Sequence, residues 1–165
     1  MAEPAIAGSS VSLKVITAAT VRAVTDLVVS PEQERYVASN AVSIAQAYFH
    51  REAWFRAIYV ADVPVGFVML RDFSLLKRTK ASPDPAPAIS LWRLMIDRHH
   101  QGRGLGRQAL ALVVAHARTR PGATALHTSY VAGPHAAGPF YLSFGFRPTG
   151  LAKANGEIDL ILDLA

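Results

Sequence analysis

A glycine-rich turn between a predicted strand and a predicted helix is the segment best suited to chemistry. It reads Gln101-Gly102-Arg103-Gly104-Leu105-Gly106-Arg107. Such a turn directs several unpaired backbone N–H groups into one small volume, where the helix dipole favours negative charge. Glycine lets the backbone approach a diphosphate because no Cβ intervenes, and Arg103 or Arg107 can add charge-assisted hydrogen bonds. Residues 101–107, the phosphate cradle, are therefore predicted to bind a diphosphate.

Two other phosphate-binding loops do not fit this segment. A dinucleotide fingerprint requires Gly-x-Gly-x-x-Gly, but the residue three after Gly104 is Arg107. A P-loop requires Gly-x-x-x-x-Gly-Lys-Ser/Thr, but the residues five after Gly102 and Gly104 are Arg107 and Ala109. A plain tight turn would not explain three alternating glycines flanked by Gln101 and Arg107.

The hydrophobic periodicity of the surrounding segments predicts a mixed α/β fold with element order β-α-α-β-β-β-α-β-α-β-β. The second helix is expected to start at Ser30-Pro31 and to run through about Phe49. The helix after the cradle is expected to present Leu105, Ala109, Leu112, Val113 and a partly buried His116 on one face. The other predicted elements are strands at 12–17, 55–61, 65–73, 89–97 and 125–131, helices at 20–27 and 139–145, and a final hairpin at 146–163.

The composition fits one domain. The chain has 165 residues, of which 51% are hydrophobic, and no cysteine, which excludes disulfides, thiolate zinc sites and cysteine nucleophiles. We expect a flexible tail over 1–10, a single domain over 11–165, and an exposed proline-containing loop over 77–87. No apolar stretch is long enough to span a membrane. A soluble, cytoplasmic protein without a membrane partner is expected.

The charges do not favour a nucleic-acid partner or a metal. The net charge is +5, but the arginines are scattered, with no combined aromatic and basic platform. His99 and His100 lack a third ligand at a useful spacing, so no metal is expected.

Two motifs resemble the GCN5-related N-acetyltransferase (GNAT) superfamily. Gln101-Gly-Arg-Gly-Leu-Gly matches its Gln/Arg-x-x-Gly-x-Gly/Ala pattern, and Pro139-Phe-Tyr-Leu-Ser-Phe-Gly-Phe146 is similar to its Phe-Tyr-x-x-x-Gly-Phe block. The resemblance is greatest to bacterial spermine/spermidine (diamine) acetyltransferases. The segments that carry it begin at Ser30 (Ser-Pro-Glu-Gln), Phe55 (Phe-Arg-Ala-Ile-Tyr), Pro64 (Pro-Val-Gly-Phe-Val-Met-Leu) and Leu91 (Leu-Trp-Arg-Leu-Met-Ile-Asp).

This resemblance implies the fold, the co-substrate and the site. The sheet would be mostly antiparallel, splayed between two strands and flanked by helices. Acetyl-CoA would bind with its pyrophosphate at the cradle and its pantetheine arm along the backbone of Leu94, Met95 and Ile96, one of whose N–H groups would hold the thioester oxygen. Tyr141 would be the general acid for the departing thiolate, the alternative being a core aromatic residue.

The general base stays open. Many family members use a glutamate on the strand that here holds Trp92 and Arg93, and this strand has no carboxylate before Asp97. Asp72, Glu52 or a chain of waters could serve instead, while Asp97 is better placed to brace the loop. Trp92 either lines the acceptor pocket or fills the core. Arg93 should have a carboxylate partner or face the cleft.

The acceptor also stays open. The resemblance favours a primary amine, with a polyamine as one candidate, although a chain of charge +5 suits a polycation poorly. An antibiotic, an amino acid or a protein N-terminus are alternatives, and so is a non-catalytic acyl-CoA-binding regulatory module. Family habit also favours a homodimer.

Overall fold

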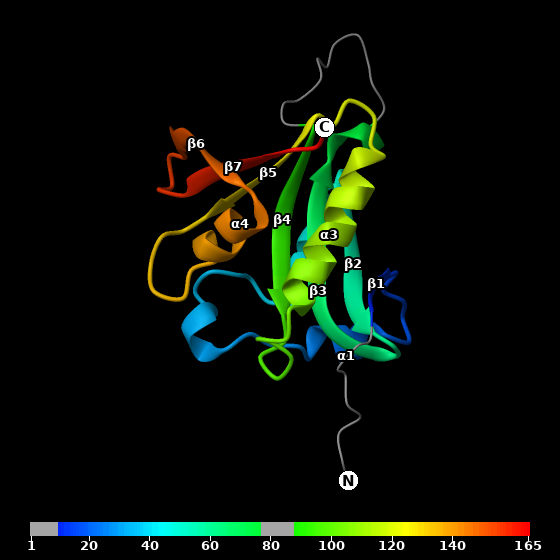
Figure 1. Cartoon of the computed structure of the whole chain (residues 1–165). Coiled ribbons are helices and arrows are strands. Elements are labelled where there is room, and N and C mark those ends of the chain that lie inside the picture. Colours follow the sequence, from blue (N-terminus) through cyan, green and yellow to red (C-terminus); the bar gives the residue numbers. More distant parts are fainter. Residues whose placement is uncertain (1–9, 77–87) are drawn as a thin grey trace.

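A seven-stranded sheet of order β1-β2-β3-β4-β5-β7-β6 forms the centre of the molecule (Figure 1). The computed structural model describes residues 10–76 and 88–165. The expected loop at 77–87 and all of the expected tail except Ser10 therefore lie outside the described residues. The sheet is antiparallel except where β4 meets β5, which confirms the predicted mixed, mostly antiparallel fold.

The predicted order of helices and strands is confirmed, with two short 3₁₀ helices added at Pro31–Gln33 and Phe73–Leu75. The strands are β1 (Val11–Lys14), β2 (Ala53–Val60), β3 (Val63–Asp72), β4 (Ile89–Ile96), β5 (Ala125–Tyr130), β6 (Arg147–Ala152) and β7 (Ile158–Asp163). The helices are α1 (Val21–Thr25), α2 (Asn40–Phe49), α3 (Leu105–Arg118) and α4 (Gly138–Phe144).

The first half of the predicted second helix is wrong. The chain makes only a 3₁₀ turn after Ser30, and α2 begins at Asn40, where Ser39 Oγ accepts a hydrogen bond from Val42 N at 3.3 Å. Between the two, Tyr36 Oη donates to Pro134 O at 2.5 Å. This long-range contact and the separate N-cap at Ser39 override the local helical spacing.

Helix α3 covers one face of the sheet and lies in front of it in Figure 1. The predicted inward face is wrong at Leu112, which is 38% exposed. The neighbouring positions fill the core instead, because the stripe that meets the sheet is rotated toward Leu110 and Val114. The buried residues of α3 are Leu105, Ala109, Leu110, Val113, Val114 and Ala117.

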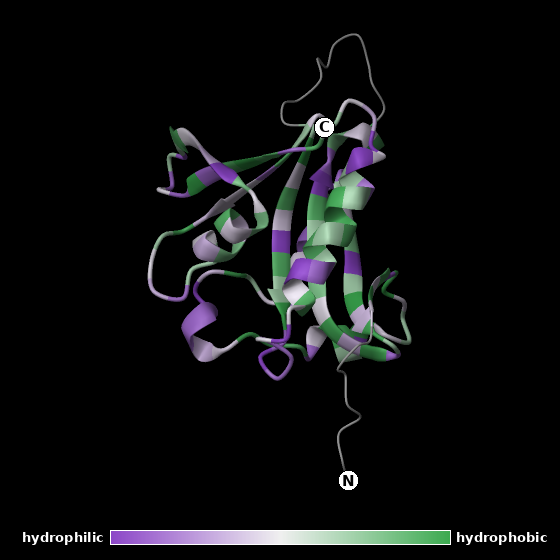
Figure 2. Cartoon of the chain, in the orientation of Figure 1, coloured by the Kyte–Doolittle hydropathy of each residue, from purple (hydrophilic) through white to green (hydrophobic). Residues whose placement is uncertain are grey.

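A second core lies on the opposite face, under α1 and α2. It includes Val24 of α1, Phe67 and Met69 of β3, and Met95 of β4. Figure 2 shows hydrophobic residues along the central strands and hydrophilic ones in the turn between β4 and α3. The two cores hold β4 between them, so its position is fixed from both sides.

The sheet opens between β4 and β5. The two strands run parallel and pair at Ser90 and His127 alone. From that pair they diverge toward their carboxyl ends, as Figure 1 shows. The splay that the family resemblance implied is therefore present.

Candidate active site

A cleft of about 1100 Å³ lies where β4 and β5 diverge. Its walls come from β4, β5, the cradle, α4, Val131, residues 135–137 and the side chains of the last hairpin at Lys153, Glu157 and Asp159. A volume of this size is sufficient for an extended small-molecule ligand together with a second substrate.

The cradle forms one end of the cleft. Gly102 and Gly104 have φ values of +75° and +74°, and a Cβ on either would meet no atom within 4 Å. Both glycines line the cleft, so the backbone there is open to a ligand. The first helical hydrogen bond joins Gln108 N to Gly104 O at 3.2 Å. The N–H groups of residues 105–107 therefore have no acceptor within α3, which suits an anionic group.

Two polar side chains fix the shape of the turn before the cradle. Gln101 Nε2 donates to Ile96 O at 2.9 Å and to Gln33 Oε1 at 2.8 Å. Asp97 accepts from Val28 N at 2.9 Å and from His99 N at 3.0 Å. The amide of Gln101 is thus engaged by the protein, and Asp97 braces the loop as its position suggested.

The two cradle arginines differ in position. Arg107 lines the cleft, where its Nη1 donates to Ser143 O at 3.2 Å and its guanidinium lies 5.2 Å from the centre of the Phe144 ring. Arg103 is exposed and is not among the cleft-lining residues. Of the two, Arg107 is the better placed to contact a bound anion.

The strand residues named from the family resemblance also lie in the cleft wall. Leu94, Met95 and Ile96 pair with Val68, Phe67 and Gly66 of β3 along one edge of β4. Their other edge faces the gap that opens beyond the Ser90–His127 pair. Backbone groups on that edge are available to an extended ligand.

Tyr141 lies in the middle of α4, in the cleft wall and buried, with 7% of its surface exposed. Burial raises the pKa of Tyr141 to about 12, against a smaller opposing effect of its hydrogen bond with Thr128. The phenol therefore keeps its proton at neutral pH. It also contacts Phe140 and Phe146, with ring centres 5.3 and 5.5 Å away. Tyr141 thus lines the cleft and packs in the core at once.

The two carboxylates considered as bases are both engaged in ion pairs. Glu52 pairs with Arg71 at 2.8 Å; burial opposes its charge, but the hydrogen bonds from Arg71 and His50 prevail and hold the pKa of Glu52 at about 2. Asp72 is fully buried against Arg120 at 2.6 Å. Neither carboxylate lines the cleft.

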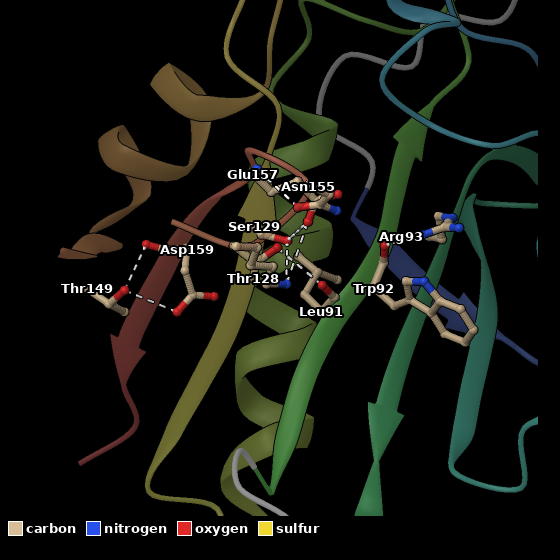
Figure 3. Close-up of polar contacts among 10 residues, drawn as sticks. Leu91, Trp92, Arg93, Thr128, Ser129, Thr149, Asn155, Glu157 and Asp159 are labelled. Atoms are coloured by element: carbon tan, nitrogen blue, oxygen red, sulfur yellow. Dashed lines mark hydrogen bonds and ion pairs between the residues drawn. The ribbon is translucent and has the colours of Figure 1, made fainter. Parts of the chain in front are cut away.

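Glu157 and Asp159 are the carboxylates of the described cleft wall, and neither was among the residues predicted from the sequence. Glu157 Oε2 accepts from Ser129 Oγ at 2.6 Å and lies 3.6 Å from Lys153 Nζ. Asp159 stands opposite Ser129 in the β5–β7 ladder and accepts from Thr149 Oγ1 at 3.2 Å. Figure 3 shows this polar group on the β5 and β7 side of the cleft. No sequence motif marks these positions.

Trp92 and Arg93 form the facing wall on β4. Trp92 lines the cleft and also packs against the core under α1 and α2, so it does both of the things considered for it. Arg93 was predicted either to have a carboxylate partner or to face the cleft, and it faces the cleft.

Within residues 10–76 and 88–165, no three His, Cys, Asp or Glu side chains gather closely enough to hold a metal ion. Over the same ranges, no helix is long and apolar enough to cross a membrane.

A sheet splayed beside a phosphate cradle defines the class of N-acetyltransferases that use acetyl-CoA. The chain belongs to the acetyltransferase (GNAT) family, whose model matches residues 21–146. It is therefore an acetyl-CoA-dependent N-acetyltransferase.

Three known proteins show how far the similarity extends. The spermine/spermidine N(1)-acetyltransferase of Bacillus subtilis (strain 168) is 26% identical over 158 residues, which cover 94% of this chain and 99% of the relative. An acetyltransferase from Thermus thermophilus matches with a TM-score of 0.67 and 20% identity, over 93% of this chain and 97% of that one. The aminoglycoside acetyltransferase AAC(6')-Ib, solved with coenzyme A, matches with a TM-score of 0.71 and 14% identity, over 93% and 95%. The two structural matches show the fold.

Proposed function

We propose that the cleft transfers the acetyl group of acetyl-CoA to the primary amine of a small acceptor, with Tyr141 as general acid. One observation carries this proposal: a phenol that keeps its proton lies in the wall of a cleft that begins at a phosphate cradle. A proton donor beside the departing thiolate stabilises it as the C–S bond breaks. The residues around the cleft divide into three roles.

The cradle binds the pyrophosphate. Gly102 and Gly104 leave room for it, and the N–H groups at the start of α3 donate to its oxygens. Arg107 adds positive charge at the same end. The free edge of Leu94, Met95 and Ile96 pairs with the pantetheine arm, and one N–H group there donates to the thioester oxygen as charge develops on it.

Glu157 accepts the proton of the attacking amine in this proposal. Its carboxylate lines the cleft, and its bond with Ser129 fixes its position on the wall facing β4. A positioned carboxylate of this kind can take the proton directly or through one water molecule. Glu157 would thus be the general base. Many family members carry this base as a glutamate on the strand that here holds Trp92 and Arg93.

Spermine and spermidine are the acceptors that the name of the Bacillus subtilis relative suggests for a first assay. Glu157 and Asp159 could each hold a cationic nitrogen. The net charge of +5 acts against a polycation at longer range. A cytoplasmic homodimer remains part of the proposal on the sequence argument alone.

A thiol-release assay with a panel of amines tests the function. Purified protein and acetyl-CoA are mixed with polyamines, amino acids, aminoglycosides and peptides, and free coenzyme A is followed with a thiol reagent. Release that depends on one class of amine, with an acetylated product found by mass spectrometry, supports transfer to that amine. If no amine accelerates thiol release while coenzyme A still binds, the protein is an acyl-CoA-binding module and the proposed function is wrong.

A further inference from the structure

A β-bulge places Trp92 and Arg93 on the same face of β4. In the ladder with β3, Leu91 stands opposite Leu70 and Arg93 opposite Met69, so Trp92 is the extra residue. Residues that stand opposite each other share a face of the sheet. Arg93 therefore shares the face of Met69, under α1 and α2, while Leu91 belongs to the core under α3. Trp92 packs on the Met69 side as well.

The indole of Trp92 holds two guanidinium groups. Those of Arg71 and Arg93 lie 5.2 and 5.1 Å from the centre of its ring. The charge of Arg71 is balanced by Glu52 at 2.8 Å. The Arg71–Glu52 pair is therefore neutral overall, and the charge that remains unbalanced next to Trp92 is that of Arg93.

Arg93 has only neutral acceptors among the described residues. Its Nη1 donates to Trp92 O at 3.0 Å and its Nη2 to Gln46 Oε1 at 3.3 Å, while its Nε is buried without a partner. No described carboxylate lies within ion-pair distance of it. A half-buried cation with no counter-charge is costly, and an anion in the cleft would remove that cost.

The pyrophosphate of acetyl-CoA is not that anion. The cradle begins beyond the end of β4, and Arg93 lies three residues before Ile96. At the rise of a strand this places Arg93 roughly 10 Å back along β4, at the Trp92 end of the cleft. The anion that Arg93 can pair with therefore belongs to the acceptor.

The facing wall carries a net negative charge. The charge of Glu157 is balanced by Lys153, which lies 3.6 Å away and also lines the cleft, whereas no described cation lies within ion-pair distance of Asp159. Glu157 and Asp159 line it, and Glu157 is near enough for its charge to raise the pKa of Arg93, against the larger lowering caused by burial. Figure 3 shows the Ser129–Glu157 group on one side of β4 and Trp92 with Arg93 on the other. The acceptor end of the cleft thus has a cation on one wall and carboxylates on the other.

We propose that the acceptor is an amino-carboxylate, whose carboxylate lies against Arg93 and whose amine faces Glu157 and Asp159. This inference rests on the proposed function and narrows its acceptor. A guanidinium and a carboxylate fit as a bidentate pair. A polyamine would satisfy only the carboxylate wall and would bring a second cation toward Arg93.

The bond changes leave the carboxylate untouched. The amine nitrogen forms a C–N bond with the acetyl carbon while the C–S bond of the thioester breaks. One proton leaves the nitrogen, and the departing thiolate takes up one proton. Arg93 is therefore a specificity residue, and its effect depends on whether the acceptor has a carboxylate.

Matched acceptors test the proposal by turnover. Each amino acid is offered as the free carboxylate and as its carboxamide, with spermine as the polyamine. The best carboxylate is expected to exceed its carboxamide at least 10-fold in kcat/KM. Arg93→Met should remove this preference for the carboxylate while leaving the KM for acetyl-CoA unchanged. Arg93→Lys keeps the charge but cannot form two parallel hydrogen bonds to a carboxylate, so it should retain part of the preference.

Arg56 supplies the matched control. Its guanidinium lies 4.6 Å from the ring centre of Trp54, its Nη1 donates to Phe55 O at 2.7 Å, and burial lowers the pKa of both Arg56 and Arg93. Arg56 is not among the cleft-lining residues. Arg56→Met should therefore keep the preference for the carboxylate, so that a loss confined to Arg93→Met is not a general effect of removing a half-buried arginine.

A binding measurement separates this proposal from the proposed function. Carboxylate and carboxamide are each titrated into the complex with coenzyme A by calorimetry, which needs no turnover. Tighter binding of the carboxylate that disappears in Arg93→Met supports the proposal, even if no acetyl transfer occurs. Equal binding of the two forms, or a preference for spermine, overturns it, even if the protein proves to be an efficient acetyltransferase.

Discussion

The hydroxyl of Thr128 on β5 donates to Leu91 O on β4 at 3.2 Å, beside the point where the two strands separate. The same side chain is near enough to the phenol of Tyr141 on α4 to lower its pKa, against the larger raising effect of burial. These contacts connect the proposed general acid to both strands of the splay. Because a buried phenol needs a polar partner, Thr128 also holds this side chain at the edge of the cleft.

Tyr141→Phe keeps the ring and removes the proton. We expect kcat to fall by about 10²- to 10⁴-fold, the usual contribution of general acid catalysis, with the KM for acetyl-CoA and the melting temperature nearly unchanged. Steady-state kinetics and thermal melting measure both. A purely structural tyrosine predicts the reverse: Phe would be tolerated, and only Ala would be harmful, through about 3–5 kcal/mol of lost stability. Wild-type turnover by Tyr141→Phe across the pH range would contradict the acid role.

The raised pKa of Tyr141 predicts a loss of stability in alkali. The folded protein holds this proton up to a pKa of about 12, while an unfolded tyrosine loses it near its model value of 10.0. Below pH 10 both states are protonated and the stabilisation is fully present; between pH 10 and 12 only the unfolded state ionises, so stability falls. Melting temperatures over this range should fall more steeply for the wild type than for Tyr141→Phe. Parallel curves would show that the phenol is not buried as described.

Glu157→Gln should separate chemistry from cofactor binding. The amide keeps an oxygen that can accept from Ser129 Oγ, so the local packing is retained. We expect kcat for the amine to fall by about 10²-fold, as for loss of a general base, with no change in the KM for acetyl-CoA. Asp159→Asn is the companion variant, because Asp159 lines the same wall and bonds to Thr149. If only Asp159→Asn slows turnover, the proton acceptor has been assigned to the wrong carboxylate.

The predicted homodimer is tested by sedimentation. Tyr48 and Phe49 of α2 are 85% and 79% exposed, and Leu151 of the edge strand β6 is 71% exposed. Burying the aromatic pair between two copies would stabilise a dimer. We expect a dimer at micromolar concentration that Tyr48→Ser with Phe49→Ser dissociates and Leu151→Ser does not. A monomeric wild type contradicts the prediction, and dissociation by Leu151→Ser alone places the interface on β6.

The order of elements and the cradle could be predicted because both depend on local sequence. Alternation and helical spacing define most elements, and the three alternating glycines of the cradle stand together in the chain. The prediction of a helix from Ser30 was wrong over its first half because Tyr36 is held by a hydrogen bond to Pro134, which lies 98 positions away in the chain. No local pattern contains that contact.

The positions of Glu157 and Arg93 in the cleft wall could not be predicted for a related reason. Glu157 follows a turn in the last hairpin, and it reaches the cleft only because β7 pairs with β5, next to the splay. The bulge at Trp92 could not be predicted either. Successive side chains of a regular strand point to opposite faces, which would place Arg93 on the opposite face from Trp92. These positions depend on strand pairing, which a single sequence does not reveal.

Gly104→Val tests the cradle, and Gly122 provides the matched control. Both glycines have a φ of +74°, and a Cβ on either would meet no atom within 4 Å. Both substitutions therefore impose the same backbone strain, of order 1–3 kcal/mol, without a steric clash inside the protein. The two sites differ in place: Gly104 lines the cleft at the start of α3, whereas Gly122 follows the end of α3 and does not line the cleft.

The two variants should lose similar stability but differ in binding. In Gly104→Val the side chain occupies the space proposed for the pyrophosphate, so the KM for acetyl-CoA should rise 10-fold or more. Gly122→Val should leave that KM at the wild-type value. Thermal melting checks the shared strain, and calorimetry with coenzyme A checks the difference. If both variants bind coenzyme A equally well, the pyrophosphate does not lie at Gly104; if both bind it weakly, backbone strain rather than a blocked site accounts for the loss.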